Sequence, residues 1–157
     1  METLERILAE HAFFEGLEPE HLKVVTGCAS NVRFTPGAYV FREGEQANQF
    51  YLLRQGKVAI EIFAPQSPPI IVDTLEKDEI LGWSWLVPPY RVRFDARAVG
   101  TVHAVAFDGA CLRGKCETDS ELGYELYRRF AVVITERLQA TRMRLLDVYG
   151  DPVATVG

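Results

Sequence analysis

The sequence lacks the signals that direct a protein into or across a membrane. No apolar run in its 157 residues approaches the roughly 20 residues that a bilayer span needs. The N-terminus, Met-Glu-Thr-Leu-Glu, has neither the basic start nor the apolar stretch of a signal peptide. We therefore expect a cytoplasmic protein.

The sequence also has few cysteines, and fewer positively than negatively charged residues. The three cysteines, Cys28, Cys111 and Cys116, are odd in number and lack the spacing of a zinc site. We expect them to be reduced and to behave as small apolar residues, with no bound metal. Lys and Arg together number 17 against 22 Asp and Glu, which gives a net charge of −5. This balance argues against a surface built mainly to bind the nucleic-acid backbone.

Catalytic motifs are missing as well. The chain has no Ser-His-Asp set, no paired-carboxylate motif, no cluster of metal ligands and no Walker loop. Its three histidines, His11, His21 and His103, belong to no motif, so we expect ordinary surface or core histidines. Nothing in the sequence therefore supports an enzyme.

Hydrophobic patterning divides the chain into helical ends and a β-rich middle. With 48% hydrophobic and 25% charged residues, the composition is that of a folded globular domain. Residues 1–29 show helical spacing, interrupted at Gly16 and resumed near Pro19, which predicts short N-terminal helices. Residues 30–108 contain short apolar stretches separated by turn signals, a pattern typical of an antiparallel roll. The turn signals are Pro36-Gly37, Glu43-Gly44-Glu45, Gln55-Gly56 and the segment from Pro65 to Pro69.

Helical spacing returns in residues 109–149, and residues 150–157 form a short tail. The pattern predicts a short helix near Cys116 and a long helix that ends at Gly150-Asp151-Pro152. One apolar stripe of the long helix follows 4-3-4-3 spacing, through Ile134, Leu138, Thr141, Leu145 and Val148. Such a stripe predicts either the seam of a helix dimer or a face packed on the chain's own roll.

Glycine-bearing motifs occur in a fixed order along this pattern. They are Phe13-Phe14-Glu15-Gly16-Leu17, Pro36-Gly37, Glu43-Gly44-Glu45, Gly56-Lys57-Val58-Ala59 and Ile80-Leu81-Gly82. Glycine at tight corners allows positive φ or close backbone approach. Together with the element order, these motifs resemble the cyclic nucleotide-binding domain family, in particular the sensor domains of CRP-FNR regulators. The resemblance covers residues 10–149 and implies a mainly β fold with flanking helices: a double-stranded β-helix, or jelly-roll-like β-roll, with N-terminal helices and a long C-terminal helix.

The resemblance also implies a phosphate-binding cassette at residues 80–98. In the family, a short helix after the glycine, an arginine and a neighbouring hydroxyl residue hold the phosphate, and a glutamate after the glycine binds the ribose 2′-hydroxyl. The implied ligand-binding residues in this cassette are Gly82, Trp83, Ser84, Arg93 and Phe94, with Arg91 as a substitute for Arg93.

Four further residues are implied by the same resemblance. Thr141 matches a threonine that faces the purine base, although it is equally a small seam residue between two long helices. Ile60, Val72 and Leu75 match positions that line the family's pocket, although any such roll also uses them as core.

The cassette departs from the family's pattern at the ribose position. Trp83 stands there, and an indole has an N–H donor but no acceptor for a hydroxyl group. The missing bond predicts roughly ten- to a hundredfold weaker binding of a 3′,5′-cyclic nucleotide. The indole also has the size to fill the cavity.

The register of Arg93 has two solutions. A count from Gly82 without gaps puts Arg93 at the phosphate arginine, whereas strand alternation puts it at the adjacent hydroxyl position. Strand alternation favours the register with Arg93 at the hydroxyl position. In that register Val92, Phe94, Ala96 and Ala98 form the apolar face of the strand, and Asp95 and Arg97 point away from the core. Arg93 is the predicted anion-binding residue in both registers, and the alternative is a solvated polar face of a strand.

These observations predict a stand-alone regulatory sensor. It binds cAMP, cGMP or a related anionic ligand, has no other cofactor and no metal, and signals through its long helix to an unidentified protein partner or to a second copy in a homodimer. No helix-turn-helix follows the long helix in this sequence, so we expect no DNA binding by this chain. The alternative is a ligand-free interaction module, whose pocket is closed by Trp83, Trp85 and Phe94 and which dimerises or docks.

Overall fold

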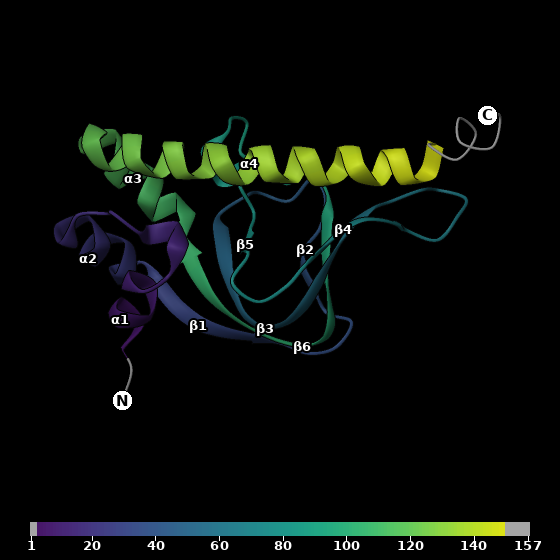
Figure 1. The fold of residues 1–157 in the computed structure, drawn as a ribbon, viewed down its shortest axis with the longest axis horizontal. Coiled ribbons are helices and arrows are strands. Elements are labelled where there is room, and N and C mark those ends of the chain that lie inside the picture. Colours follow the sequence, from purple (N-terminus) through teal and green to yellow (C-terminus); the bar gives the residue numbers. More distant parts are fainter. Residues whose placement is uncertain (1–2, 150–157) are drawn as a thin grey trace.

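The computed structural model describes residues 3–149. Helices α1 (Leu4–Ala9) and α2 (Pro19–Gly27) precede a roll of six strands, and α3 (Gly109–Thr118) and α4 (Ser120–Tyr149) follow it. Figure 1 shows α4 lying lengthwise across the roll, with α3 beside its first turns and α2 and α1 below them on the same side of the roll. The predicted mainly β fold with flanking helices is confirmed, and the predicted tail of residues 150–157 lies outside the described residues. None of the helices in residues 3–149 has the length and apolarity that a membrane crossing requires.

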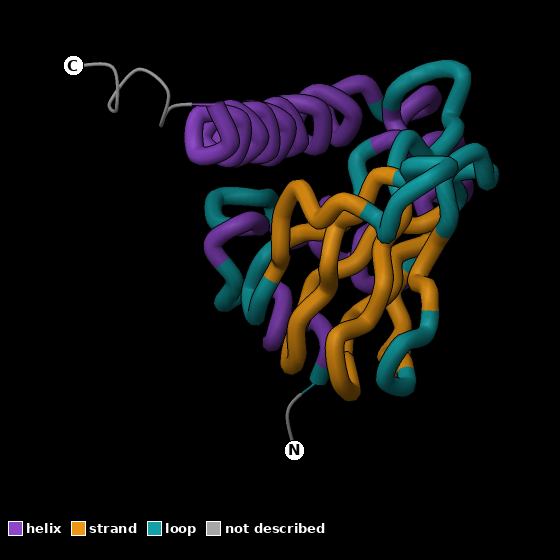
Figure 2. The backbone as a smooth tube through the Cα atoms, turned by 90° about the vertical axis from the view of Figure 1, so that its right-hand side faces the viewer, coloured by secondary structure: helices purple, strands orange, loops and turns teal. Residues whose placement is uncertain are grey.

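Two long strands form the frame of the roll. Strands β3 (Gln49–Ile62) and β6 (Asp95–Asp108) pair antiparallel from Gln49↔Asp108 to Glu61↔Asp95. At one end, β1 (Ala29–Phe34) adds to β6 and β5 (Ile80–Leu81) adds to β3. At the other end, β2 (Tyr39–Phe41) adds to β6 and β4 (Ile70–Leu75) adds to β3. The two ends of the long pair therefore have different neighbours, and Figure 2 shows the strands wound into a roll.

The long pair bends at Gly56, which has a φ of +93°. The pairing register shifts on both sides of Gln55, where the two strands turn together. A Cβ on Gly56 would lie 2.3 Å from the carbonyl oxygen of Thr101, which is far inside contact distance. Glycine is therefore required here both for its backbone conformation and for the close approach of β6.

An aromatic cluster joins α4 to one end of the roll. The Phe50 ring stacks on Phe107 at a centroid distance of 4.4 Å and on Trp85 at 4.9 Å, and Phe130 of α4 meets Phe50 edge-on at 4.9 Å. Phe50, Trp85 and Phe107 are fully buried. This cluster fixes the N-terminal half of α4, while a second cluster fills the other end of the roll.

The start of β6 differs from the prediction. Val92, Ala96 and Ala98 are buried as the alternation predicts, but Asp95 is buried too, with 4% of its surface exposed. Its carboxylate accepts a hydrogen bond from the Glu43 N–H at 2.7 Å, a partner that a periodicity argument does not include. The expectation that Asp95 stays outside the core is wrong, because a buried carboxylate is stable where such donors satisfy it.

Candidate functional site

A cavity of about 350 Å³ lies between the roll and α4. We call it the roll-helix cavity. Its walls come from β3, β4, β5 and the segment that leads into β6, and α4 closes it from above. The volume falls within the roughly 300–1,000 Å³ usual for small-molecule sites. Of the residues predicted at the site, those in its lining are Ile60, Val72, Leu75, Gly82, Trp83, Arg93, Phe94 and Thr141.

Two of the predicted residues lie elsewhere in the described structure. Ser84 begins the short helix η2 (Ser84–Leu86) and is buried, and its carbonyl oxygen accepts from the Val87 N–H at 3.2 Å. Arg91 is exposed, and its Nη1 donates to the carbonyl oxygen of Gly44 at 3.2 Å. The geometry therefore distinguishes Arg93 from Arg91, which the sequence left as substitutes.

Arg93 brings positive charge to the edge of the cavity. It is exposed, it lies between η2 and β6, and it lines the cavity. Within residues 3–149 its guanidinium has no hydrogen bond or ion pair, whereas Arg91, Arg97 and Arg137 all have partners. An unpaired guanidinium beside a mainly apolar wall favours an anionic ligand, because it presents its donors in a fork that matches phosphate oxygens.

Sequence reasoning missed Arg137, which also lines the cavity. Its Nη1 donates to Asp73 Oδ2 of β4 at 2.5 Å, and its Nη2 donates to Glu79 Oε1 at 3.0 Å. Its Nε is buried and has no partner within the described structure. Arg137 therefore connects α4 to the roll at the wall of the cavity. Its position four residues before Thr141 was the available signal, because residues at that spacing share a helix face.

Aromatic side chains narrow the cavity without filling it. Trp83 is half-buried in its wall, and Phe94 lines it while packing on Phe41 at a centroid distance of 5.5 Å. Trp85 points the other way, into the aromatic cluster of the core, where it is fully buried. The sequence-based alternative named all three as a plug, but Trp85 takes no part in the wall.

Two cysteines that are distant in sequence lie close together. The Sγ atoms of Cys28, after α2, and Cys111, in α3, are 3.4 Å apart. Burial and the neighbouring Cys111 raise the pKa of Cys28 to about 11, so its thiol stays protonated at neutral pH. Because the two cysteines are 83 positions apart in the sequence, no argument based on spacing could predict this pair.

Comparison with known proteins agrees with this geometry. The family model of the cyclic nucleotide-binding domain matches residues 31–119, more than half of the chain. The CRP-like cAMP-activated global transcriptional regulator of Mycobacterium tuberculosis is 28% identical over 145 residues, which is 92% of this chain and 63% of the regulator. Human cGMP-dependent protein kinase 2 is 27% identical over 112 residues, which is 71% of this chain and 14% of the kinase.

A solved structure extends the match over nearly the whole fold. A protein of Geobacter metallireducens, assigned as a cyclic nucleotide-binding protein, superimposes with a TM-score of 0.77 at 30% identity. The match covers 88% of this chain and 99% of that one. Because the family model covers the roll and the cassette region, and a solved structure matches 88% of the chain at 30% identity, the chain belongs to the cyclic nucleotide-binding domain family.

Proposed function

We propose that the roll-helix cavity binds an anionic small molecule, cAMP, cGMP or a related compound, and that the chain is a regulatory domain that signals through α4. The observation that carries this proposal is the unpaired Arg93 guanidinium at the edge of a cavity that both the roll and α4 line. The names of two relatives, one cAMP-activated and one cGMP-dependent, support the ligand class.

The same geometry supports a route from ligand to helix. Arg93 lies on the roll side of the cavity, while Thr141 and Arg137 belong to α4. A ligand that contacts both sides binds with different affinity when α4 is close to the roll and when it is displaced. Only such a difference in affinity can shift the equilibrium between two positions of a helix. The bound ligand would then connect the roll to α4.

Calorimetric titration of the full chain tests the proposal. With cAMP, cGMP and cyclic dinucleotides at millimolar concentration, we expect saturable heat with at least one ligand, and its loss in Arg93→Ala. Arg91→Ala is the matched control, because Arg91 belongs to the same segment but donates to Gly44. If no ligand gives binding heat, in a chain shown to be folded by circular dichroism, the sensor assignment is overturned and the interaction module is favoured.

A homodimer through α4 is the proposed quaternary arrangement. The predicted stripe is divided: Ile134, Leu138 and Thr141 line the cavity, while Leu145 is 56% exposed beyond it. The side chain of Val148, the last member of the stripe, lies outside what the structure describes. Leu146 at 60% and Met143 at 52% exposure add apolar surface to the same turns, which supports a partner helix there.

Light scattering after size exclusion tests the dimer. We expect twice the chain mass for the wild type and the mass of one chain for Leu145→Asp, because a carboxylate buried in an apolar seam is strongly unfavourable. Arg144→Gln makes the same change in charge on another side of α4, away from Leu145, Leu146 and Met143, and should leave the mass unchanged. A wild type that elutes as a single chain at all concentrations contradicts the dimer but leaves the ligand proposal intact.

A further inference from the structure

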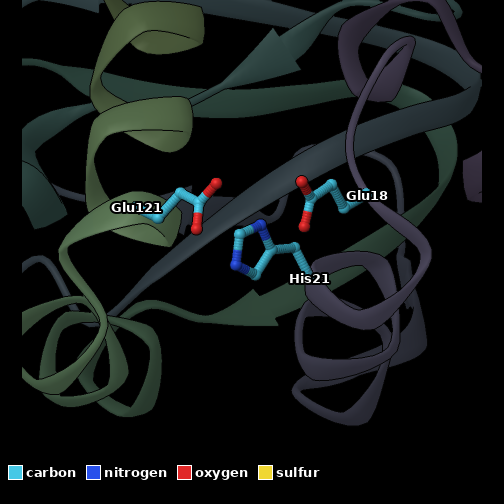
Figure 3. Close-up of side chains that lie close together, drawn as sticks. All are labelled: Glu18, His21 and Glu121. Atoms are coloured by element: carbon cyan, nitrogen blue, oxygen red, sulfur yellow. The ribbon is translucent and has the colours of Figure 1, made fainter.

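Three side chains with metal-binding chemistry meet where α2 approaches the start of α4. They are Glu18 and His21 of the α2 region and Glu121 in the first turn of α4 (Figure 3). One ligand atom from each lies within 4.8 Å of the other two. The cluster is separate from the roll-helix cavity, because none of its members lines that cavity.

His21 is the buried member of the cluster, and the sequence predicted no special role for it. Only 7% of its surface is exposed, and its Nδ1 is buried with no hydrogen-bond partner in the described part of the chain. Its Nε2 lies 3.3 Å from Asp119 Oδ2. In Figure 3 the ring lies between the two glutamates, with a nitrogen directed towards their carboxylates.

The contact with Asp119 fixes the orientation of the ring. A carboxylate accepts hydrogen bonds, so we assign the proton to Nε2 and the lone pair to Nδ1. Asp119 is itself held in place, because its Oδ1 accepts from the Leu122 N–H at 3.2 Å. Nδ1 therefore faces two carboxylates without a hydrogen-bond partner in the described structure, and a cation between these three groups would satisfy all of them.

Both glutamates are available as ligands. Glu18 is the N-cap residue of α2, but its side chain makes no capping hydrogen bond. Glu18 and Glu121 are exposed, and neither forms an ion pair with any residue in 3–149. Their side chains can therefore rotate towards a shared ion without breaking another interaction.

We propose that Glu18, His21 and Glu121 bind a divalent transition-metal ion of the Zn²⁺ class. Imidazole favours such ions over Mg²⁺ and Ca²⁺, and one histidine with two carboxylates is a donor set that they accept. A tetrahedral ion bonded at about 2.0–2.2 Å holds its ligand atoms about 3.4 Å apart. Closure from 4.8 Å needs only rotation of the two exposed glutamates. Asp119 orients the histidine from behind, as the partners of metal-bound histidines usually do.

The ion would connect a helix that precedes the roll in the sequence with one that follows it. Glu18 and His21 precede the roll in sequence, whereas Glu121 follows it and begins the long helix. A metal bond across this contact would fix the base of α4 against α2. The role is structural, and it is independent of ligand binding in the roll-helix cavity.

Zinc titration of the full chain tests the inference. With Zn²⁺ alone as the probe, we expect calorimetry to show one site and the melting temperature to rise by several degrees. Glu18→Gln and Glu121→Gln should each weaken binding at least tenfold and remove the rise. Glu20→Gln is the matched control, because Glu20 is exposed on the same turn of α2 but outside the cluster. The glutamates are exposed, so these variants test the site without disturbing the core, and His21→Gln should abolish binding.

The thiols of Cys28 and Cys111 are the competing zinc ligands, since they lie 3.4 Å apart. The Cys28→Ser/Cys111→Ser double variant should keep the site if the inference is right. Zinc binding that survives both glutamate variants but disappears with the thiols would overturn it, as would a wild type that binds no zinc.

Discussion

Arg137 and Asp73 join α4 to β4 across 64 residues of sequence, with Nη1 and Oδ2 2.5 Å apart. The two side chains are only 21% and 20% exposed, so water screens the pair less than it screens a surface ion pair. The same guanidinium also donates to Glu79 at 3.0 Å. Like the aromatic cluster, this ion pair joins α4 to the roll. It holds the part of α4 that passes over the roll-helix cavity.

We expect Asp73→Asn to loosen this contact. Hydrogen bonds to charged groups contribute about 1.5–3 kcal/mol, so the free energy of unfolding should fall by an amount in this range. Amide hydrogen exchange in α4 around Arg137 should become faster. Lys57→Gln is the control, because the Lys57–Glu76 pair is about 60% exposed on both sides and should contribute less than about 1 kcal/mol. Equal effects of the two variants would contradict a special role for Arg137.

Trp83→Glu should increase affinity for cAMP. The change supplies a carboxylate acceptor at the wall of the cavity, where the indole has none. A charge-assisted hydrogen bond of about 1.5–3 kcal/mol corresponds to roughly a ten- to hundredfold lower dissociation constant. Calorimetry with cAMP and with 2′-deoxy-cAMP measures the effect, since the gain should vanish with the deoxy compound. Trp83→Ala separates the new acceptor from the removal of bulk, and a gain of equal size in that variant would refute the ribose contact.

Arg97→Met should destabilise the roll strongly. Arg97 donates from Nε and Nη2 to Glu61, whose side chain is only 2% exposed, with the shortest contact at 2.7 Å. Removal of the arginine leaves a buried, uncompensated carboxylate, which costs about 3–5 kcal/mol. The double variant Arg97→Met/Glu61→Met removes both charges and should recover most of the loss in urea unfolding. A loss below about 1 kcal/mol in the single variant would show that Glu61 finds water or another partner.

Stability should fall at high pH through Tyr51. Burial, with a smaller effect of Glu45, raises the pKa of its phenol from 10.0 to about 12. Below pH 10 both the folded and the unfolded state keep the proton, so the contribution is fully present there. As pH rises from 10 to 12, only the unfolded state ionises, and stability falls by about 1.4 kcal/mol per pH unit.

Tyr51→Phe isolates this effect. The variant loses the hydrogen bond from Oη to Gln49 Oε1, so it should be less stable at neutral pH by about 1 kcal/mol. Between pH 10 and 12 its unfolding free energy should decline less steeply than that of the wild type. Parallel curves would mean that the Tyr51 phenol ionises equally easily in both states.

The fold was predictable because its signals are local. Gly16 and Pro19 mark helix ends through their own backbone preferences, and the structure has helix ends there. Gln55-Gly56 predicted a turn between two strands, but β3 runs through it as one strand with a bend at Gly56, because β6 bends alongside it and keeps the pairing. The apolar face of Val92, Ala96 and Ala98 was equally visible as a two-residue period. Patterns of this kind need no knowledge of which segments later meet.

The features that the sequence did not predict are contacts between segments that are distant in the sequence. Periodicity cannot show that the Glu43 N–H reaches Asp95, or that Asp73 lies opposite Arg137. The candidate site was therefore predicted mainly through its family resemblance, which identified Arg93 and Thr141 as lining candidates but not the ion pair beside them. His21 was missed for the same reason, since its neighbour Asp119 is far away in sequence.

The last turns of α4 extend beyond the roll. Every side chain from Arg142 to Asp147 is exposed, and Figure 1 shows this part of the helix projecting past β4. From Arg137 to Tyr149 the axis advances by about 18 Å at 1.5 Å per residue. A tilt of about 10° at Arg137 therefore displaces the final turn by about 3 Å, a third or so of the distance between two packed helices. If the proposed signal tilts α4, the exposed end of the helix would act as a lever arm that turns a small angular change into a displacement of a few ångströms at a neighbouring surface.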